Sequence, residues 1–316
     1  VAFSLFFDYF FAISISTMAV IAFSGATHDI ACDGVYMAEL NKEEQAKYIG
    51  VQGAFYNVAK LVANGGLVAM AGALAEYFGA IEGASLEANK GAYSYAWMII
   101  FAVIAAIMVL IGLYHIRMLP SNQIPSTTKK TTSEVGRELV AVIANFFTKK
   151  HIFYYICFII LYRLAEGFIM KIAPLFLRAS REVGGLGLSL KEIGTLNGVF
   201  GSAAFVLGSL LAGIYVSKFG LKRTLFTLCC IFNLPFLAYT FLAVTQPTNV
   251  YLIGTCITME YFGYGFGFVG LTLFMMQQIA PGKHQMSHYA FASGIMNLGV
   301  MLPGMVSGFV SDWLGY

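Results

Sequence analysis

The chain has 316 residues, of which 59% are hydrophobic and 11% charged, and its mean hydropathy is +0.75. Soluble domains carry about 25% charged residues, so this composition excludes an ordinary water-soluble fold and indicates a membrane protein. The net charge of +3 gives no electrostatic support to nucleic-acid binding. The five cysteines lie in apolar stretches without metal or redox spacing, and we interpret them as buried free thiols.

Eight apolar segments are long enough to cross a hydrocarbon core of about 30 Å. In chain order they are 9–32, 49–75, 94–116, 152–178, 190–217, 222–244, 249–277 and 285–312. We therefore predict an all-α membrane protein. Because the sequence starts at Val1 without a methionine and stops against an apolar segment, we interpret it as part of a longer protein.

The distribution of basic residues predicts the orientation. The connections after segments one, three, five and seven contain 12 lysines and arginines, whereas the opposite connections contain 4. Basic residues accumulate on the cytoplasmic side of a membrane. The first set of connections is therefore predicted to be cytoplasmic, in a multi-pass protein of the inner (plasma) membrane.

The longest connection, 117–150, is predicted to contain a helix of its own. Thr131-Thr132-Ser133-Glu134 has the spacing of a helix capping box, and apolar residues follow at helical intervals. Arg137, Lys149 and Lys150 surround them, which is typical of a helix that lies in the membrane interface. This connection divides the chain into three domains: 1–116 with three helices, the connection at 117–150, and 151–316 with five helices.

Arg163 and Glu166 lie in the middle of the fourth segment, three residues apart and so on one helix face. An ionised side chain at the bilayer centre costs about 2.5–3.5 kcal/mol on insertion scales, so such groups face a protein interior or water. The two could be an ion pair that fixes helix packing or part of a substrate or proton site. We favour the site, because packing alone rarely needs full charges.

Glu260 stands in the seventh segment beside several glycines, a stretch that we interpret as a flexible turn open to close approach. A lone carboxylate there is a candidate proton carrier, because protonation removes a charge that is costly in a membrane. Hydrogen bonding to a neighbouring helix would explain it equally well. Glycine pairs at spacing four, Gly194/Gly198, Gly263/Gly267 and Gly304/Gly308, predict close helix contacts.

The first two segments also carry polar residues. Asn57 and Lys60 belong to a polar stripe on the second, and His28 to one on the first. Asp29 and Asp33 follow near its cytoplasmic end, where hinge contacts or chemistry would explain them.

No nucleotide-binding motif, metal set or other cofactor site is apparent, so transport would draw its energy from a gradient. The alternative is a membrane-embedded sensor or acyl-CoA-handling protein without vectorial transport. Its only His-Asp pair, His28-Asp29, consists of adjacent residues that point about 100° apart on a helix, which argues against a catalytic dyad.

Several strings together resemble the AmpG-type muropeptide permeases of the major facilitator superfamily. His28-Asp29-Ile30-Ala31-Cys32-Asp33 is similar to their Q-D-I-x-x-D, Tyr162 to Phe168 to Y-[KR]-L-G-D-A-F, Glu192 to Asn197 to E-V-G-x-x-N, and Glu260 with Gly265 and Gly267 to E-x-x-x-x-G-x-G. Residues 213–223 are similar to the superfamily loop G-x-x-x-D-[RK]-x-G-x-[RK]-[RK], with Lys218, Lys222 and Arg223 at the basic positions.

Three departures from the family pattern stand out. Ser217 replaces the loop aspartate, His28 replaces the glutamine, and Tyr56-Asn57-Val58-Ala59 lacks the arginine of the family's Y-R-L-G, although Lys60 follows it. The resemblance implies a twelve-helix fold of two six-helix halves joined by a cytoplasmic connection. Three helices before this chain and one after it would then be absent.

We therefore predict a secondary active transporter, not an enzyme, that imports a polar solute such as a muropeptide with protons, acting as a monomer in the bilayer. The predicted substrate residues are Arg163, Glu166, Asn57, Lys60, His28 and Asn197. The predicted proton-coupling residues are Glu260 and Glu166. The predicted gating residues are Asp29, Asp33, Lys218, Lys222 and Arg223.

Overall fold

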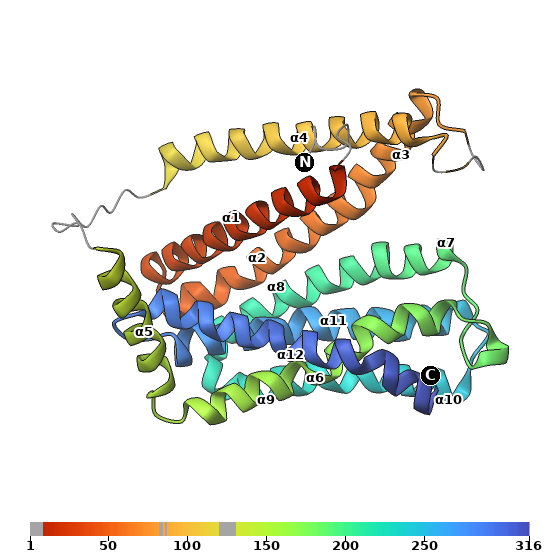
Figure 1. Ribbon diagram of the computed structural model, residues 1–316. Helices are drawn as coiled ribbons and strands as arrows, with labels where there is room; N and C mark the ends of the chain where they lie inside the picture. Colours follow the sequence, from red (N-terminus) through yellow and green to blue (C-terminus); the bar gives the residue numbers. More distant parts are fainter. Residues whose placement is uncertain (1–8, 82–84, 86, 120–130, 316) are drawn as a thin grey trace. The chain divides into compact units, whose positions relative to one another are not determined.

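The computed structural model describes residues 9–81, 85, 87–119 and 131–315 (Figure 1). The regular secondary structure of these residues is helical and includes no strand, as predicted. The elements are α1 (Phe10–Glu39), α2 (Lys42–Leu61), η2 (Val62–Leu67), α3 (Val68–Tyr77), α4 (Lys90–Met118), α5 (Thr132–Phe147), α6 (Ile152–Arg178), η3 (Arg181–Val183), α7 (Leu190–Ile193), η4 (Gly194–Gly201), α8 (Ser202–Phe219), α9 (Leu221–Asn233), η5 (Leu234–Phe236), α10 (Leu237–Thr245), α11 (Val250–Phe274), η6 (Met275–Ile279) and α12 (Gln285–Leu314). Lys129 and Lys130 of the predicted connection lie outside the described residues.

The chain divides into two compact units. Unit 1 contains residues 1–29 and 60–134, and unit 2 contains residues 30–59 and 135–316. In unit 1, α3 packs against α4. In unit 2, α11 packs against α8, α9 and η4, while α6 packs against α12. The middle of the first predicted domain, residues 30–59, thus folds together with the last helices of the chain.

Seven helices of the described chain are long and apolar enough to cross a membrane: 10–39, 42–77, 90–118, 152–178, 190–219, 221–245 and 285–314. Eight such segments were expected from the sequence. The remaining one, 249–277, forms α11 and η6, and most of the second half of α11 is buried by other helices. Because its neighbours rather than lipid cover this helix, its glycines and Glu260 are tolerated.

The first two predicted segments have different boundaries from those observed. Helix α1 continues to Glu39 instead of ending near residue 32, and α2 begins at Lys42 instead of residue 49. Asn41 explains the early start, because its Oδ1 accepts hydrogen bonds from the backbone amides of Glu43 and Glu44, both at 3.0 Å. The Tyr36 hydroxyl then donates to the Gln45 carbonyl at 2.7 Å and joins the two helices.

The predicted capping box before α5 is confirmed. The Thr131 amide donates to Glu134 Oε2 at 2.7 Å, and the Glu134 amide donates to Thr131 Oγ1 at 3.4 Å. These two bonds satisfy amides that the first turn of a helix leaves without partners. Helix α5 therefore begins where the sequence predicts.

The glycine-rich stretch after Glu260 is not a turn but part of the continuous helix α11. Its glycines bring other helices close. A Cβ atom at Gly265 would lie 2.2 Å from the Phe205 carbonyl oxygen of α8, and one at Gly267 would lie 2.3 Å from the Phe232 side chain of α9. Small residues at these positions let three helices approach backbone to backbone.

The other glycine pairs differ in their outcome. Gly263 and Gly267 both make close contacts with α9 and its extension, and Gly304 lies against α6, as predicted. Within the described part of the chain, no atom outside the local helix backbone lies within 4 Å of a Cβ built at Gly194, Gly198 or Gly308, so the predicted contacts at these glycines are wrong. The cysteines are free, but the prediction that they are buried is also wrong, since Cys157 is exposed and the others are half-buried.

Replacing Gly265 by alanine tests the close contact between α11 and α8. The new Cβ would overlap the Phe205 carbonyl group, which is backbone and cannot rotate away. We expect a loss of stability of about 1–3 kcal/mol, measured as a lower midpoint of thermal unfolding in detergent.

The matched control is Gly294→Ala on α12, where a Cβ meets no atom within 4 Å. We expect this variant to be as stable as the parent or slightly more stable, because alanine favours a helix over glycine. Equal midpoints for both variants would contradict the proposed backbone contact at Gly265.

Candidate substrate and proton site

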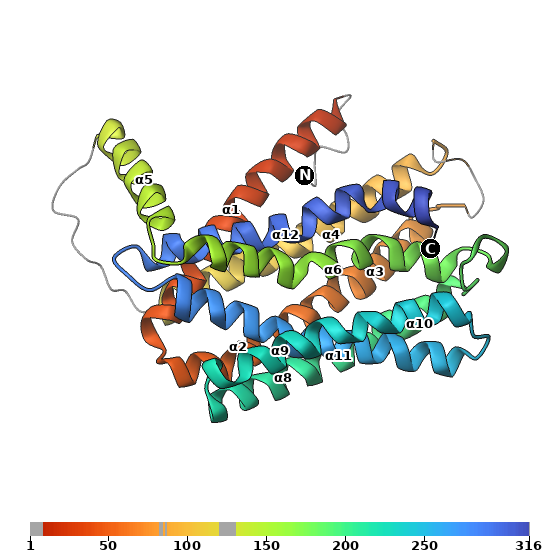
Figure 2. The ribbon, with the colours of Figure 1, turned by 90° about the horizontal axis from the view of Figure 1, so that it is seen from below.

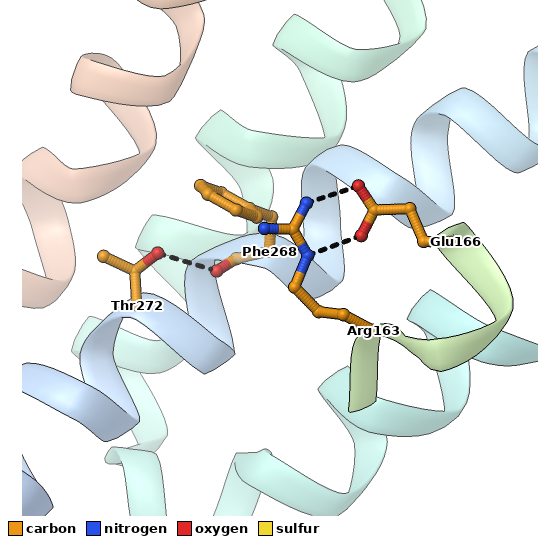
Figure 3. Close-up of polar contacts among 4 residues, drawn as sticks. All are labelled: Arg163, Glu166, Phe268 and Thr272. Atoms are coloured by element: carbon orange, nitrogen blue, oxygen red, sulfur yellow. Dashed lines mark hydrogen bonds and ion pairs between the residues drawn. The ribbon is translucent and has the colours of Figure 1, made fainter. Parts of the chain in front are cut away.

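Arg163 and Glu166 form a bidentate ion pair on α6. Arg163 Nε donates to Glu166 Oε2 at 2.6 Å, and Nη2 donates to Oε1 (Figure 3). The exposed fractions are 6% for Arg163 and 2% for Glu166. Two parallel charge-assisted hydrogen bonds compensate the cost of removing both charges from water. The structure thus brings the two predicted residues together.

Helix α11 supplies the opposite wall of this site. The Phe268 ring lies under the Arg163 guanidinium, whose Cζ is 5.4 Å from the ring centroid. Such a cation-π contact suits arginine, which is more weakly hydrated than lysine. One turn further along, Thr272 Oγ1 donates to the Phe268 carbonyl at 3.1 Å (Figure 3). Tyr264, one turn before Phe268, lies within electrostatic reach of both members of the pair.

Tyr162 joins α6 to α11 beside the ion pair. Its side chain is buried, and its hydroxyl donates to the Gly267 carbonyl at 2.7 Å. The ring packs against Phe232 of α9, with centroids 4.8 Å apart. This bond and this packing fix the rotation of α6, so Arg163 on the next position faces α11.

Glu260 lies on α11, one turn before Tyr264, and is buried with an exposed fraction of 8%. It makes no ion pair with another described residue. Glu166, Tyr239 and Tyr261 are within its electrostatic reach. The two predicted proton-coupling carboxylates therefore share one buried region, and only Glu166 has a basic partner there.

Part of α2 belongs to the same compact unit as this site. Asn57 is buried, and its Nδ2 donates to the Gly53 carbonyl of its own helix at 3.1 Å. Tyr56 lies within electrostatic reach of Tyr264. Gly53 lies against Ser209 and Phe205 of α8. The middle of α2 thus approaches the site from the side of α8.

Three other predicted residues of the first domain belong to unit 1. These are His28, Asp29 and Lys60. The His28 ring stacks on His115 of α4, with centroids 5.5 Å apart and an angle of 12° between the planes. Among the described residues, no group of three or more His, Cys, Asp or Glu side chains could hold a metal ion.

Asn197 lies in η4, a π-helical segment that packs against α11. Its Oδ1 is buried and accepts no hydrogen bond from any described residue. A cavity of about 790 Å³ lies nearby; its lining includes Leu196, Thr258 and Met259, but not Arg163 or Glu166. Glu192, from the same sequence motif, caps α7 through Ser189. Its part of the motif is therefore explained by local helix geometry.

The predicted gating residues occupy different environments. Asp29 and Asp33 both lie within α1 rather than in a loop, and Asp33 is buried. Lys218, Lys222 and Arg223 are exposed around Gly220, which has the positive φ of 78° that glycine favours between α8 and α9. None of these three forms an ion pair with another described residue, and Ser217 stands at the position of the family aspartate.

The sequence interpretation missed Tyr264, Phe268 and Tyr162. The first two could have been found, because Glu260, Tyr264, Phe268 and Thr272 recur every four residues and therefore share one face of α11. The role of Tyr162 depends on a contact between residues 105 positions apart, for which the sequence gives no signal.

Comparison with known proteins identifies the family. The model of the Major Facilitator Superfamily matches residues 1–308. The chain belongs to this superfamily. It is also 23% identical over 192 residues to the anhydromuropeptide permease of Escherichia coli (strain K12), and equally to that of Escherichia coli O157:H7. Each match covers 61% of this chain and 38% of the relative, so the chain matches well under half the length of these permeases.

Membership of the superfamily confirms several predictions. The chain is a member of the Major Facilitator Superfamily and is related to the AmpG-like permeases. This membership and the seven apolar helices together show a multi-pass protein of the inner membrane. The roles of individual residues are not tested by these comparisons.

Removing one member of the ion pair tests its contribution to stability. Glu166→Leu would leave the Arg163 guanidinium buried without its carboxylate, and we expect a loss of roughly 3–5 kcal/mol. The double variant Arg163→Met/Glu166→Leu should recover most of this loss, because no unpaired charge remains. Thermal unfolding in detergent measures both. A single variant as stable as the parent would show that the pair does not form.

Proposed function

We propose that the protein imports a polar, anionic solute together with a proton, by alternating access and as a monomer. The observation that supports this proposal is the buried Arg163–Glu166 pair with Glu260 nearby on α11. A pair with a purely structural role would need only two opposite charges. Glu260 is a third ionisable group, it has no basic partner among the described residues, and its carboxylate could carry a proton.

In this proposal Arg163 binds the anionic group of the solute. Glu166 occupies the edge of the guanidinium formed by Nε and Nη2, and in this proposal a solute carboxylate displaces the Glu166 carboxylate from that edge. The exchange replaces one bidentate pair by another and keeps the guanidinium charge compensated throughout. Phe268 holds the guanidinium plane in place during the exchange.

Glu166 and Glu260 then couple this exchange to a proton. Once released from Arg163, Glu166 is a second carboxylate without a cation in the same buried region. Two carboxylates that share such a region titrate as a coupled pair and retain a proton between them. Solute binding from the outer side would thus bring one proton from that side onto the pair. Release of the solute to the cytoplasm would let Glu166 return to Arg163 and release the proton into the cytoplasm.

Asn57 and Asn197 are proposed to contact the polar remainder of the solute. Asn57 is buried on α2 close to the site, and the Asn197 Oδ1 atom accepts no hydrogen bond from a described residue. A buried polar atom without a partner is costly, so a ligand group that donates to it would be favoured. His28 and Lys60 remain predictions for the wall of the first domain.

A muropeptide is the solute that we favour. Its peptide carries carboxylates for Arg163, and its sugars carry hydroxyl groups that asparagine side chains can bind. The sequence resemblance and the 23% identity to the anhydromuropeptide permeases support this choice. His28 and Asn57 replace the glutamine and the arginine of the family sequence motifs, and these differences would change which muropeptides bind.

The contact between α2 and α8 is the proposed gate on the cytoplasmic side. A Cβ at Gly50 of α2 would lie 2.2 Å from the carbonyl oxygen of Ser209 in α8. A Cβ at Gly213 of α8 would lie 3.0 Å from the carbonyl oxygen of Ala46 in α2. Gln277 of η6 also donates to the Lys42 carbonyl at 3.0 Å. Opening toward the cytoplasm requires these contacts to separate. Lys218, Lys222 and Arg223 lie at the adjoining ends of α8 and α9, and Asp33 lies within α1.

Uptake of labelled anhydromuropeptide by vesicles that contain the full-length protein tests the function. We expect accumulation when an inward proton gradient is imposed and none without it. Binding without uptake would instead mark a sensor, and the absence of both would exclude muropeptides as the solute.

Glu260→Gln tests the proton assignment. The amide cannot exchange a proton, so we expect gradient-driven accumulation to fall to the level seen without a gradient while solute binding persists. Glu192→Gln is the matched control, because Glu192 is a capping carboxylate outside the ion-pair region and should leave uptake unchanged. Gradient-driven uptake at the parent rate in Glu260→Gln would remove the assignment.

Gly213→Val tests the gate. Its side chain would push against the backbone of Ala46 and Lys47 and favour the open cytoplasmic side. A cysteine at position 46, which is buried in the parent, should then react several-fold faster with a membrane-impermeant maleimide added from the cytoplasmic side. Gly294→Val, at a glycine without close contacts, should not change the rate, and an equal rise in both variants would speak against the gate.

A further inference from the structure

The cavity beside η4 is separate from the Arg163 site. It lies between η4 and the first half of α11, and its volume is about 790 Å³. Thr195, Leu196 and Phe200 line it from η4, and Tyr251, Thr255 and Met259 line it from α11. None of the residues proposed above to bind the solute belongs to this lining. Sites for small organic molecules have volumes of roughly 300–1,000 Å³, so the cavity is large enough to be a second binding site.

The hydroxyl groups in the lining are engaged within their own helices. Thr195, Thr255 and Thr258 each donate to the backbone carbonyl four residues before them, at 2.8, 2.9 and 2.7 Å. The Ser189 hydroxyl donates to Glu192 Oε2 at 2.7 Å. A hydroxyl has one hydrogen to donate, so these four side chains have none left for a ligand. The interior therefore favours an apolar ligand over a sugar or a peptide, whose polar groups would lose water without gaining donors.

The cavity extends along α11 over about the depth of one lipid leaflet. Both views show the end of α6 and the connection from α10 to α11 at one end of unit 2, away from the α8–α9 turn (Figures 1 and 2). The distribution of basic residues predicts that this end faces outward. From Val250 to Met259, the lining covers nine residue steps of α11, or about 14 Å at 1.5 Å per residue. Half of a hydrocarbon core of about 30 Å is about 15 Å.

The outer end of the cavity carries a basic side chain. Lys191 is exposed there and forms no ion pair with another described residue. The neighbouring Glu192 is engaged through Oε2, which accepts from both the amide and the hydroxyl of Ser189, at 2.8 and 2.7 Å. Tyr251 is exposed at the first turn of α11. Lysine and tyrosine at the ends of membrane spans lie at the level of the lipid headgroups, where lysine attracts phosphate.

We propose that the cavity between η4 and α11 binds one acyl chain of a phospholipid from the outer leaflet, with the lipid phosphate at Lys191. Three observations favour this occupant: the lining engages its own hydroxyl groups, the depth matches one leaflet, and the basic side chain lies at the end where the phosphate would be. The bound lipid would support the first half of α11, the helix that also carries Glu260.

Native mass spectrometry of the full-length protein with added phosphatidylglycerol tests this inference, because it resolves individual bound lipids. Thr255→Trp should fill the cavity and lower the affinity for the first bound lipid several-fold. Thr245→Trp on α10 is the matched control. Thr245 is also exposed and also donates to the carbonyl four residues before it, at 2.7 Å, but it lies outside the lining. We expect its affinity to equal that of the parent.

Lys191→Gln tests the phosphate contact and remains informative if Thr255→Trp does not fold. We expect the affinity for the first phosphatidylglycerol to fall about fivefold, because one lysine near the headgroups loses its attraction to the phosphate. Arg178→Gln is the matched control, since Arg178 is an exposed basic residue at the same end of unit 2 but outside the lining. Its affinity should not change.

Four results would overturn the proposal. Parent-like affinity in both Thr255→Trp and Lys191→Gln would place the lipid elsewhere. No retained lipid on the parent would mean that other helices of the full-length protein cover the cavity. Displacement of the lipid by an equal concentration of inorganic phosphate would show that the acyl chain is not recognised. Displacement by anhydromuropeptide would make the cavity part of the solute path. All of these measurements are independent of transport.

Discussion

The bidentate pair between Arg163 and Glu166 is the interaction on which the rest of the site depends. An unpaired ion in a membrane interior is costly, so each of these two charges requires the other. Both side chains come from one helix, which means that the pair can form without any contact from elsewhere. Other helices must then enclose it, stack against the guanidinium and leave a path for an exchangeable anion.

Helix α11 provides this enclosure because glycines replace side chains where α8 and α9 approach. Other helices bury most of the second half of α11, and this helix is not among the seven apolar spans of the described chain. Glu260, Tyr264 and Phe268 lie along one face of this helix. Helix α11 therefore serves both packing and chemistry. Its glycines determine how closely α8 and α9 approach, and the face with Glu260, Tyr264 and Phe268 supplies the carboxylate and the aromatic rings of the site.

Much of the fold could be predicted from the sequence. Apolar length predicted the helices, the capping box predicted the start of α5, and the three-residue spacing placed Arg163 and Glu166 on one helix face. The predicted end of α1 and the predicted start of α2 were wrong, because Asn41 caps a helix that extends beyond the apolar segment. The predicted close helix contact at Gly194 and Gly198 was wrong, because the spacing of glycines does not show which face of their helix is covered by another helix. The hydrogen bond from Tyr162 to Gly267 depends on tertiary packing, which spacing along the chain does not encode.

Proton uptake on solute binding is the measurement that tests the account most directly. Binding heats of a muropeptide to the full-length protein, measured at one pH in buffers of different ionisation enthalpy, give the number of protons taken up. We predict about one proton per bound solute for the parent and close to none for Glu260→Gln, because the coupled carboxylates would hold that proton. Solute binding by the parent without proton uptake would contradict the exchange of Glu166 for the solute at Arg163.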